Sequence, residues 1–173
     1  LVPFPPPNYL RRSLKRSLLG SPLRDYPDRT HEQLREAIAD WHSIDPSMVL
    51  PGNGAAELCT WAARDASQEG LSALPSPCFG DYLRALCCWN GSYVREALPL
   101  SWSSVSPQHF PLTPSSDVIW ITNPHNPTGQ LWSRESLQQL LSRYSLVICD
   151  EAFLPLVPGG ESQSLISLVI DHP

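Results

Sequence analysis

The sequence predicts an α/β protein in which helices cover both faces of a mostly parallel sheet, a three-layer αβα arrangement. Strand-like and helix-like segments alternate along the chain, which is typical of sheets built from parallel strands. Two of the strand-like segments, residues 117–122 and 146–150, are apolar on both faces apart from their ends. Strands of this kind lie at the centre of a parallel sheet, between two layers of helices.

Composition indicates a globular protein and argues against two kinds of partner. The chain has 173 residues, of which 42% are hydrophobic, enough for one hydrophobic core. Its formal net charge is -5, and the one strongly basic run, Arg11–Arg16, is too short to mark a nucleic-acid surface. No apolar run approaches the roughly 18 residues that span a membrane. We therefore expect no nucleic-acid partner and no membrane partner.

The five cysteines are expected to be reduced thiols. They form no CxxC pair, and several lie in apolar segments, which suits buried thiols in a cytoplasmic protein. No charged-then-apolar signal segment opens the sequence. A metal site is not expected, because no second histidine or cysteine stands at metal-ligand spacing around His125.

Two helices and a short strand are expected in the first 50 residues. Asn8 is expected to cap one helix, which repeats leucine at helical spacing until Gly20 stops it. The next begins at Thr30, where Gln33 completes a capping box. Its apolar side chains fall on one stripe that we expect to be buried, namely Leu34, Ala37, Ile38 and Trp41. The strand is expected at residues 48–50.

The rest of the chain continues the alternation. Further strands are expected at residues 71–74 and 93–98, and a further helix at residues 55–67. Another helix is expected after the segment PCFGDY and should end at about Trp89. Two more helices are expected, one capped by Ser133 and one that begins near Glu161. Asn90 and Gly91 are expected to close the helix that reaches Trp89. Residues 99–116, rich in proline and serine, are expected to form a loop-rich connection.

Ligands of parallel sheets bind beyond the carboxyl ends of the strands. Four segments fall at such ends: GNGAAE after Leu50, PCFGDY after Leu74, NPHNPTG after Thr122 and DEAF after Cys149. The third holds two asparagines, two prolines, a threonine and a glycine within seven positions, more turn formers than a simple reversal of the chain needs. We expect the four segments to converge on one crevice.

Each segment has an ordinary interpretation beside a functional one. Residues 52–54 suit a phosphate cradle at a helix start, but they also suit a glycine turn with a helix cap, since they lack the third glycine of a dinucleotide fingerprint and the lysine of a P-loop. Asp150 is either the polar end of a strand or a charged partner for a cationic group of a ligand. Phe79 is either a core residue or a ring that stacks on a cofactor. Glu151 points to the opposite side and is expected to be structural.

Taken together, the segments resemble the class I and II aminotransferases, fold-type-I enzymes that use pyridoxal 5'-phosphate (PLP). NPHNPTG matches the Asn-Pro-x-Asn-Pro-Thr-Gly signature of that family, and a strand ending in DEAF follows it. The order YPD, GNGAAEL, PCFGDY, NPHNPTG and DEAF is similar to the branch with histidinol-phosphate aminotransferase and threonine-phosphate decarboxylase. The resemblance covers nearly the whole chain. It implies that residues 1–45 are an N-terminal arm with helices of a small or linker region, and that residues 46–173 are part of the PLP-binding large domain.

The resemblance also implies roles for individual residues. Asp150 would pair with the pyridine nitrogen of PLP and keep it protonated, so that the ring accepts electrons from the substrate. Asn126 would hydrogen-bond the 3'-oxygen of the ring, aimed by the prolines and glycine of its loop. The other contacts would come from the backbone N–H groups of Gly54, Ala55 and Ala56 to the phosphate, from Phe79 stacked on the ring, and from Tyr26 across a homodimer.

Two features depart from the family pattern. Phe153 stands where many aminotransferases have a tyrosine that contacts the 3'-oxygen, which favours the threonine-phosphate decarboxylase side of the branch. The family's Schiff-base lysine lies some tens of residues after the aspartate, whereas the one lysine here is Lys15, before every motif. We therefore expect either a piece of a longer enzyme, incomplete at both ends, or a truncated product without activity of its own. PLP would then bind weakly, through its phosphate and ring.

The prediction is a PLP-dependent aminotransferase acting on an amino acid, with phosphorylated amino acids among the candidates, in a cytoplasmic homodimer. A threonine-phosphate decarboxylase of cobalamin biosynthesis is the alternative within the family. A catalytically silent PLP-fold fragment, which acts by binding or pairing, is the alternative from another class. Without the lysine, the chain alone is expected to be inactive, and its sheet is expected to end in an exposed edge.

Overall fold

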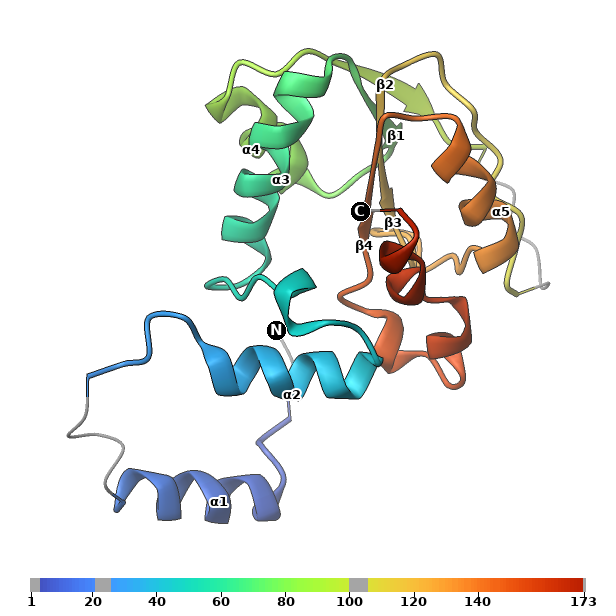
Figure 1. Ribbon diagram of the computed structural model, residues 1–173. Helices are drawn as coiled ribbons and strands as arrows, with labels where there is room; N and C mark the ends of the chain where they lie inside the picture. Colours follow the sequence, from blue (N-terminus) through green and yellow to red (C-terminus); the bar gives the residue numbers. More distant parts are fainter. Residues whose placement is uncertain (1–3, 21–25, 100–105, 173) are drawn as a thin grey trace.

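The computed structural model describes residues 4–20, 26–99 and 106–172 (Figure 1). Its centre is a parallel sheet, which has four strands in the described residues, in the order β2-β1-β3-β4. The strands are β1 (Ser72–Ser76), β2 (Tyr93–Ala97), β3 (Val118–Thr122) and β4 (Leu146–Asp150). Helices lie on both faces of this sheet, so the predicted three-layer α/β class is confirmed.

Two pairs of helices form the outer layers (Figure 1). One layer holds α3 (Ala55–Glu69) and α4 (Gly80–Cys88), and the other holds α5 (Arg134–Gln138) and the 3-10 helix η3 (Gln139–Ser142). Three short 3-10 helices follow β4: η4 (Leu154–Leu156), η5 (Gly160–Gln163) and η6 (Ile166–Ile170). The sheet is thereby enclosed between apolar helix faces.

Strand β3 shows how the sequence divides the core. All five of its residues are buried, and successive side chains point to opposite faces. Val118 and Trp120 join the cluster that includes Leu86 of α4, while Ile119 and Ile121 join the cluster on the α5 face. The continuous apolar run is therefore explained by burial on both sides, as the sequence predicts.

Strand β4 differs from its prediction. Residues 146–150 were expected at the centre of the sheet, yet all five are only half-buried, and β4 pairs with β3 alone among the described strands. The apolar pattern is thus correct for a strand, but wrong as a mark of central position in this part of the sheet. The exposed edge that the sequence predicts lies here.

The N-terminal helices contribute little to this core. Helix α1 (Asn8–Leu18) buries none of its residues, and α2 (Glu32–His42) buries only Ala39. Leu34 is 50% and Trp41 69% exposed, so the expectation that α2 buries its apolar stripe is wrong for the single chain. The stripe has the helical spacing but no described element that covers it.

The start of α2 also differs from the expected capping box. Thr30 does not cap the helix, and His31, the residue just before α2, makes no side-chain cap hydrogen bond. Instead the carboxylate of Asp28 accepts hydrogen bonds from the Thr30 N–H at 2.9 Å, the Thr30 hydroxyl at 2.7 Å and the Glu32 N–H at 2.7 Å. The Asp28 carboxylate therefore accepts the first N–H of α2, and the Thr30 hydroxyl donates to that carboxylate instead of accepting from the helix.

Several other local predictions can be compared directly. Residues 48–50 form no strand: Met48 ends the 3-10 helix η2 (Pro46–Met48), which the Asp45 side chain caps, and residues 49–50 belong to no helix or strand. The helix expected near Glu161 is only the short η5. Ser133 does cap α5, and Asn90, with φ of +53°, follows α4 as predicted. Residues 99 and 106–116 form no helix or strand, and residues 100–105 of that connection lie outside the described residues.

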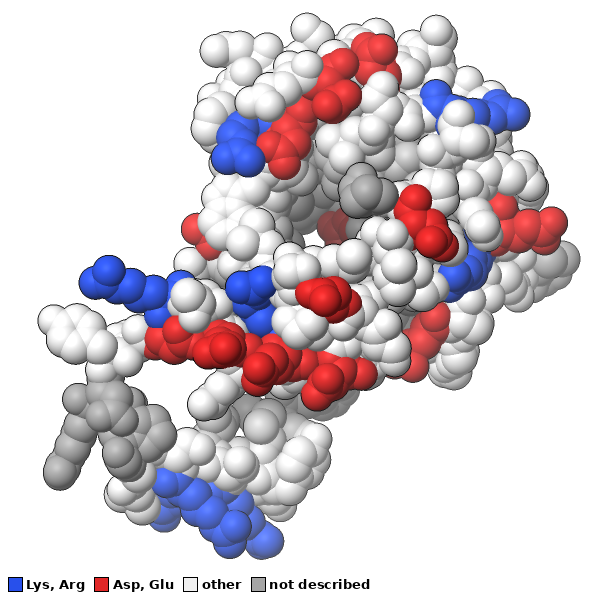
Figure 2. Space-filling view, viewed as in Figure 1, with Lys and Arg blue, Asp and Glu red and all other residues white. Residues whose placement is uncertain are grey.

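Charge is unevenly distributed on the surface. Figure 2 shows Lys and Arg gathered on α1, where the basic run Arg11–Arg16 is exposed, and Asp and Glu along α2 above it. The positive patch is therefore one helix long on this face. In the part of the chain that the structure describes, no helix has both the length and the apolar character to span a bilayer.

Candidate functional site

A pocket of about 420 Å³ lies where the start of α3 meets the carboxyl end of β4. Its wall includes Gly54 and Ala55 of the α3 start, Tyr82 of α4, and Asp150 with Ala152 at the end of β4. Segments that lie almost 100 residues apart in the sequence thus line one cavity. The predicted phosphate cradle and the predicted carboxylate face the same space.

The start of α3 is shaped as an anion site. Gly54 has φ of +86° and ψ of 172°, a backbone conformation that residues with a side chain rarely adopt. The first intrahelical bond there runs from the Leu58 N–H to the Gly54 carbonyl, and no side chain caps the helix. The N–H groups of Ala55 and Ala56 therefore point out of a 15-residue helix, with the positive end of its dipole behind them.

Glu57 leaves this cradle accessible although it is acidic. Its carboxylate accepts the Asn53 N–H at 2.6 Å and the Asn53 side-chain amide at 3.0 Å. Both bonds hold the carboxylate against the preceding turn. The pocket-lining groups of the α3 start, Gly54 and Ala55, remain uncovered.

The Asp150 carboxylate is held at both oxygens. Oδ2 accepts the Tyr82 hydroxyl at 2.8 Å, and Oδ1 accepts the Ala152 N–H at 3.0 Å. The Asp150 carbonyl accepts the Asn123 N–H at 2.9 Å, which ties the ends of β3 and β4 together. This carboxylate is a fixed negative charge at the pocket wall and suits a cationic ligand group.

The loop after β3 is a rigid structure with two buried polar side chains. Asn123 is fully buried, and its side chain accepts the Trp132 N–H at 2.8 Å and donates to the Trp132 carbonyl at 3.3 Å. His125 is also buried, with Nε2 2.8 Å from the Pro77 carbonyl and Nδ1 2.7 Å from the Thr128 hydroxyl. A carbonyl only accepts, so Nε2 carries the proton and Nδ1 accepts from Thr128. His125 thereby ties this loop to the loop that carries Phe79.

Not all the predicted site residues line the pocket. Phe79 packs edge-on against Tyr82, with ring centroids 5.5 Å apart. Asn126 lies beyond the carboxyl end of β3, half-buried, on the loop just described. Ala56 offers its carbonyl to Arg84 at 3.0 Å, and Tyr26 is 94% exposed. The pocket therefore joins Gly54, Ala55 and Asp150, while the other four surround it or stand apart from it.

Sequence patterns missed Tyr82 as part of the pocket wall and Thr122 as its hydrogen-bond partner. The tyrosine of PCFGDY falls on the buried face of α4 with Ala85 and Leu86, and such a pattern predicts only a core residue. The one usable signal is a hydroxyl on an otherwise apolar face, since a buried hydroxyl requires a partner.

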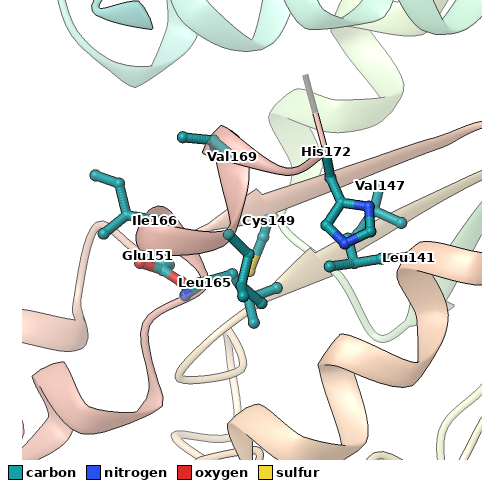
Figure 3. A pocket seen from close by; sticks show the side chains of 9 residues that line it. Leu141, Val147, Cys149, Glu151, Leu165, Ile166, Val169 and His172 are labelled. Atoms are coloured by element: carbon teal, nitrogen blue, oxygen red, sulfur yellow. Dashed lines mark hydrogen bonds between the residues drawn. The ribbon is translucent and has the colours of Figure 1, made fainter. Parts of the chain in front are cut away.

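A second pocket, of about 380 Å³, lies on the other side of β4 (Figure 3). Its lining is mostly apolar and includes Leu141, Val147 and Leu165. The one carboxylate in it, Glu151, accepts the Leu165 N–H at 2.7 Å and the Ser164 hydroxyl at 2.5 Å. Its side chain therefore fixes the chain after η5, in agreement with the structural role expected for Glu151.

The His125 contacts predict a pH-dependent stability. Burial lowers the pKa of His125 below the value of about 6.5 in unfolded chains. The imidazole is therefore protonated at a lower pH in the folded state than in the unfolded state. Stability is then full above pH 6.5 and decreases below it. At pH 7.5, His125→Gln should cost about 1–2 kcal/mol through its two hydrogen bonds, and this difference should shrink at pH 5. Urea unfolding of both proteins at the two pH values measures it; an equal difference at both would contradict the neutral imidazole.

Comparison with known proteins agrees with these features. The family model described as aminotransferase class I and II matches residues 2–173. The chain belongs to this family. It is 32% identical over 167 residues to histidinol-phosphate aminotransferase 1 of Methylococcus capsulatus, covering 95% of this chain and 45% of the relative. It is 31% identical over 171 residues to threonine-phosphate decarboxylase of Salmonella typhimurium, covering 93% of this chain and 46% of the relative.

Two solved structures of other proteins have the same fold as this chain. The histidinol-phosphate aminotransferase of Clostridium acetobutylicum superimposes with a TM-score of 0.64 at 20% identity, over 95% of this chain and 48% of that one. L-threonine-O-3-phosphate decarboxylase of Porphyromonas gingivalis superimposes with a TM-score of 0.64 at 22% identity, over 88% of this chain and 47% of that one. The chain thus spans about half the length of the relatives that it matches.

Proposed function

We propose that the protein is a PLP-dependent enzyme of the aminotransferase type that acts on an amino acid. One observation carries the proposal: the uncapped start of α3 and the Asp150 carboxylate line the same pocket. PLP has an anionic phosphate and a basic ring nitrogen, which fit a helix N-terminus and a carboxylate respectively. A pocket of about 420 Å³ is of the size that small ligands occupy.

The described residues fit the cofactor at both ends. Gly54, Ala55 and Ala56 would hold the phosphate through backbone N–H groups, and Asp150 would pair with the ring nitrogen. Phe79 and Asn126 are proposed to contact the ring from the two loops that His125 links. Bound PLP supplies a ring that accepts electrons from the substrate; this chain's own residues bind it, orient it and hold the proton on its nitrogen.

Titration with PLP tests the proposal. Tryptophan fluorescence and the circular dichroism of the cofactor report binding, and pyridoxal, which lacks the phosphate, is the matched ligand. We expect saturable binding of PLP at least about tenfold tighter than that of pyridoxal, because charge-assisted hydrogen bonds to the phosphate are lost. Absence of saturable binding, or equal affinity for the two, contradicts the proposed site.

A threonine-phosphate decarboxylase is the second candidate function. Phe153, half exposed beyond the end of β4, offers no hydroxyl to a cofactor and favours this side of the family. Incubation of an intact protein that includes a Schiff-base lysine with threonine phosphate separates the candidates, since carbon dioxide release indicates the decarboxylase and keto-acid formation indicates the aminotransferase. Turnover of neither kind, together with PLP binding, indicates a catalytically silent protein, in line with Lys15 lying on α1.

We further propose a cytoplasmic homodimer with shared sites. Its support is the exposure of Tyr26 and of the apolar side chains of α1 and α2, which suits a surface covered by a second copy. All five cysteines are free, which suits a reducing compartment. The division into residues 1–45 and 46–173 stays part of this proposal. Analytical ultracentrifugation at micromolar concentration tests the dimer; a monomer at all concentrations contradicts it.

A further inference from the structure

We propose that Tyr82 and Thr122 form a hydrogen-bonded pair that positions the Asp150 carboxylate toward the ring nitrogen of the cofactor. This inference rests on the proposed function, because it assigns a role to two residues of the same site. Tyr82 and Thr122 act through Asp150 and are positioning residues.

The contacts form a short chain of hydroxyl groups. The Tyr82 hydroxyl lies 2.8 Å from Asp150 Oδ2 and 2.9 Å from the Thr122 hydroxyl. An ionised carboxylate only accepts, so Tyr82 gives its single proton to Asp150, and the Thr122 hydroxyl donates to the Tyr82 oxygen. The order of donation is fixed as Thr122 to Tyr82 to Asp150.

Burial keeps this order intact. Tyr82 and Thr122 are both buried. Burial, aided by the negative charge of Asp150, raises the pKa of the Tyr82 hydroxyl far above its usual value. The phenol therefore stays protonated, and remains a donor, throughout the pH range in which the protein is folded.

The tyrosine itself is held by packing. Its ring contacts Phe79 edge-on and lies 5.0 Å from the ring of Trp120, whose indole N–H donates to Ser72 at 3.3 Å. Tyr82 comes from α4 and Thr122 from the end of β3, where it stands in register with Asp150. Helix α4 and strands β1 and β3 thus together set the position of the Asp150 Oδ2 atom.

The arrangement leaves Asp150 able to bind a ligand. A carboxylate has about four acceptor sites, and the described contacts use one on each oxygen. The side chain lines the pocket and is held in one orientation before a ligand arrives. Preorganised groups of this kind bind more tightly because little freedom is lost on binding.

Removal of the Tyr82 hydroxyl tests the inference. We expect Tyr82→Phe to weaken PLP binding about tenfold, the usual effect of one hydrogen bond to a charged group. An analogue of PLP with carbon in place of the ring nitrogen should bind Tyr82→Phe and the unchanged protein equally, since it cannot pair with Asp150. Tyr144→Phe is the matched control, because Tyr144 is also buried and its hydroxyl donates to the Pro114 carbonyl at 2.9 Å, away from Asp150.

Thr122 provides a second, independent pair of variants. Thr122→Val removes the hydroxyl at constant shape and should weaken PLP binding severalfold, while Thr122→Ser keeps the hydroxyl and should restore it. This pair decides the question if Tyr82→Phe does not fold. A merely structural role would lower the melting temperature without this dependence on the ring nitrogen.

Three outcomes overturn the inference. Equal PLP affinity in Tyr82→Phe and the unchanged protein shows that Asp150 needs no positioning, and leaves the proposed function intact. An equal loss for PLP and for the carbon analogue shows that the variant damages the pocket as a whole. No PLP binding by the unchanged protein overturns the inference and the proposed function together, which distinguishes the two failures.

Discussion

Asp150→Asn should lower the affinity for PLP about 100-fold, the largest effect expected of any single change in the pocket. The amide has nearly the shape of the carboxylate, and its oxygen can still accept the Tyr82 hydroxyl, which lies 2.8 Å from Oδ2. Its NH2 group then replaces the oxygen that accepts the Ala152 N–H, so this bond is lost together with the negative charge that pairs with a protonated ring nitrogen. Charge-assisted hydrogen bonds are worth about twice as much as neutral ones. Fluorescence titration with PLP measures the change.

The control for this prediction is a carboxylate outside the site. Asp65 lies on the exposed face of α3 and pairs with its neighbour Arg64 at 2.9 Å, an interaction of little energetic value at the surface. Asp65→Asn removes the same charge from the protein and should leave PLP affinity within about twofold. If the two variants bind PLP alike, net charge, and not the position of Asp150, governs binding.

The sequence predicts best the elements whose cause is local. The apolar run of β3 and the Ser133 cap of α5 depend on neighbouring residues alone, and both are found. The position of β4 depends on which other strands pair with it, and no pattern within residues 146–150 contains that information. For the same reason the stripe of α2 has the right spacing without the burial, since burial needs a covering element.

The candidate site shows the same division. The strand-end position of Asp150 follows from a local pattern, but its fixing does not, because Tyr82 stands 68 residues before it in the chain. At the start of α2, Asp28 and Thr30 are both plausible caps, and only the backbone geometry decides between them. Contacts between distant segments, and choices among equivalent polar residues, are the parts that sequence patterns leave open.

The two asparagines of the NPHNPTG loop give the sharpest case of such a choice. Asn123→Ala should destabilise the protein by about 3 kcal/mol, because it removes two hydrogen bonds and leaves the N–H and carbonyl of buried Trp132 without partners. Asn126→Ala, the matched variant three positions away, should change the free energy of unfolding by about 0.5 kcal/mol or less. Urea unfolding followed by tryptophan fluorescence measures both.

For PLP affinity, in contrast to stability, Asn126→Ala should have a larger effect than Asn123→Ala. Asn126→Ala should lower PLP affinity about tenfold, as expected for the loss of one hydrogen bond to the 3'-oxygen, and it should do so in a fully folded protein. Asn123→Ala should bind PLP nearly normally at low temperature, where it remains folded, since its side chain faces Trp132 and lies outside the pocket. If Asn126→Ala unfolds the protein, or binds PLP unchanged, then both asparagines serve only to build the loop, and the ring contact must come from another residue.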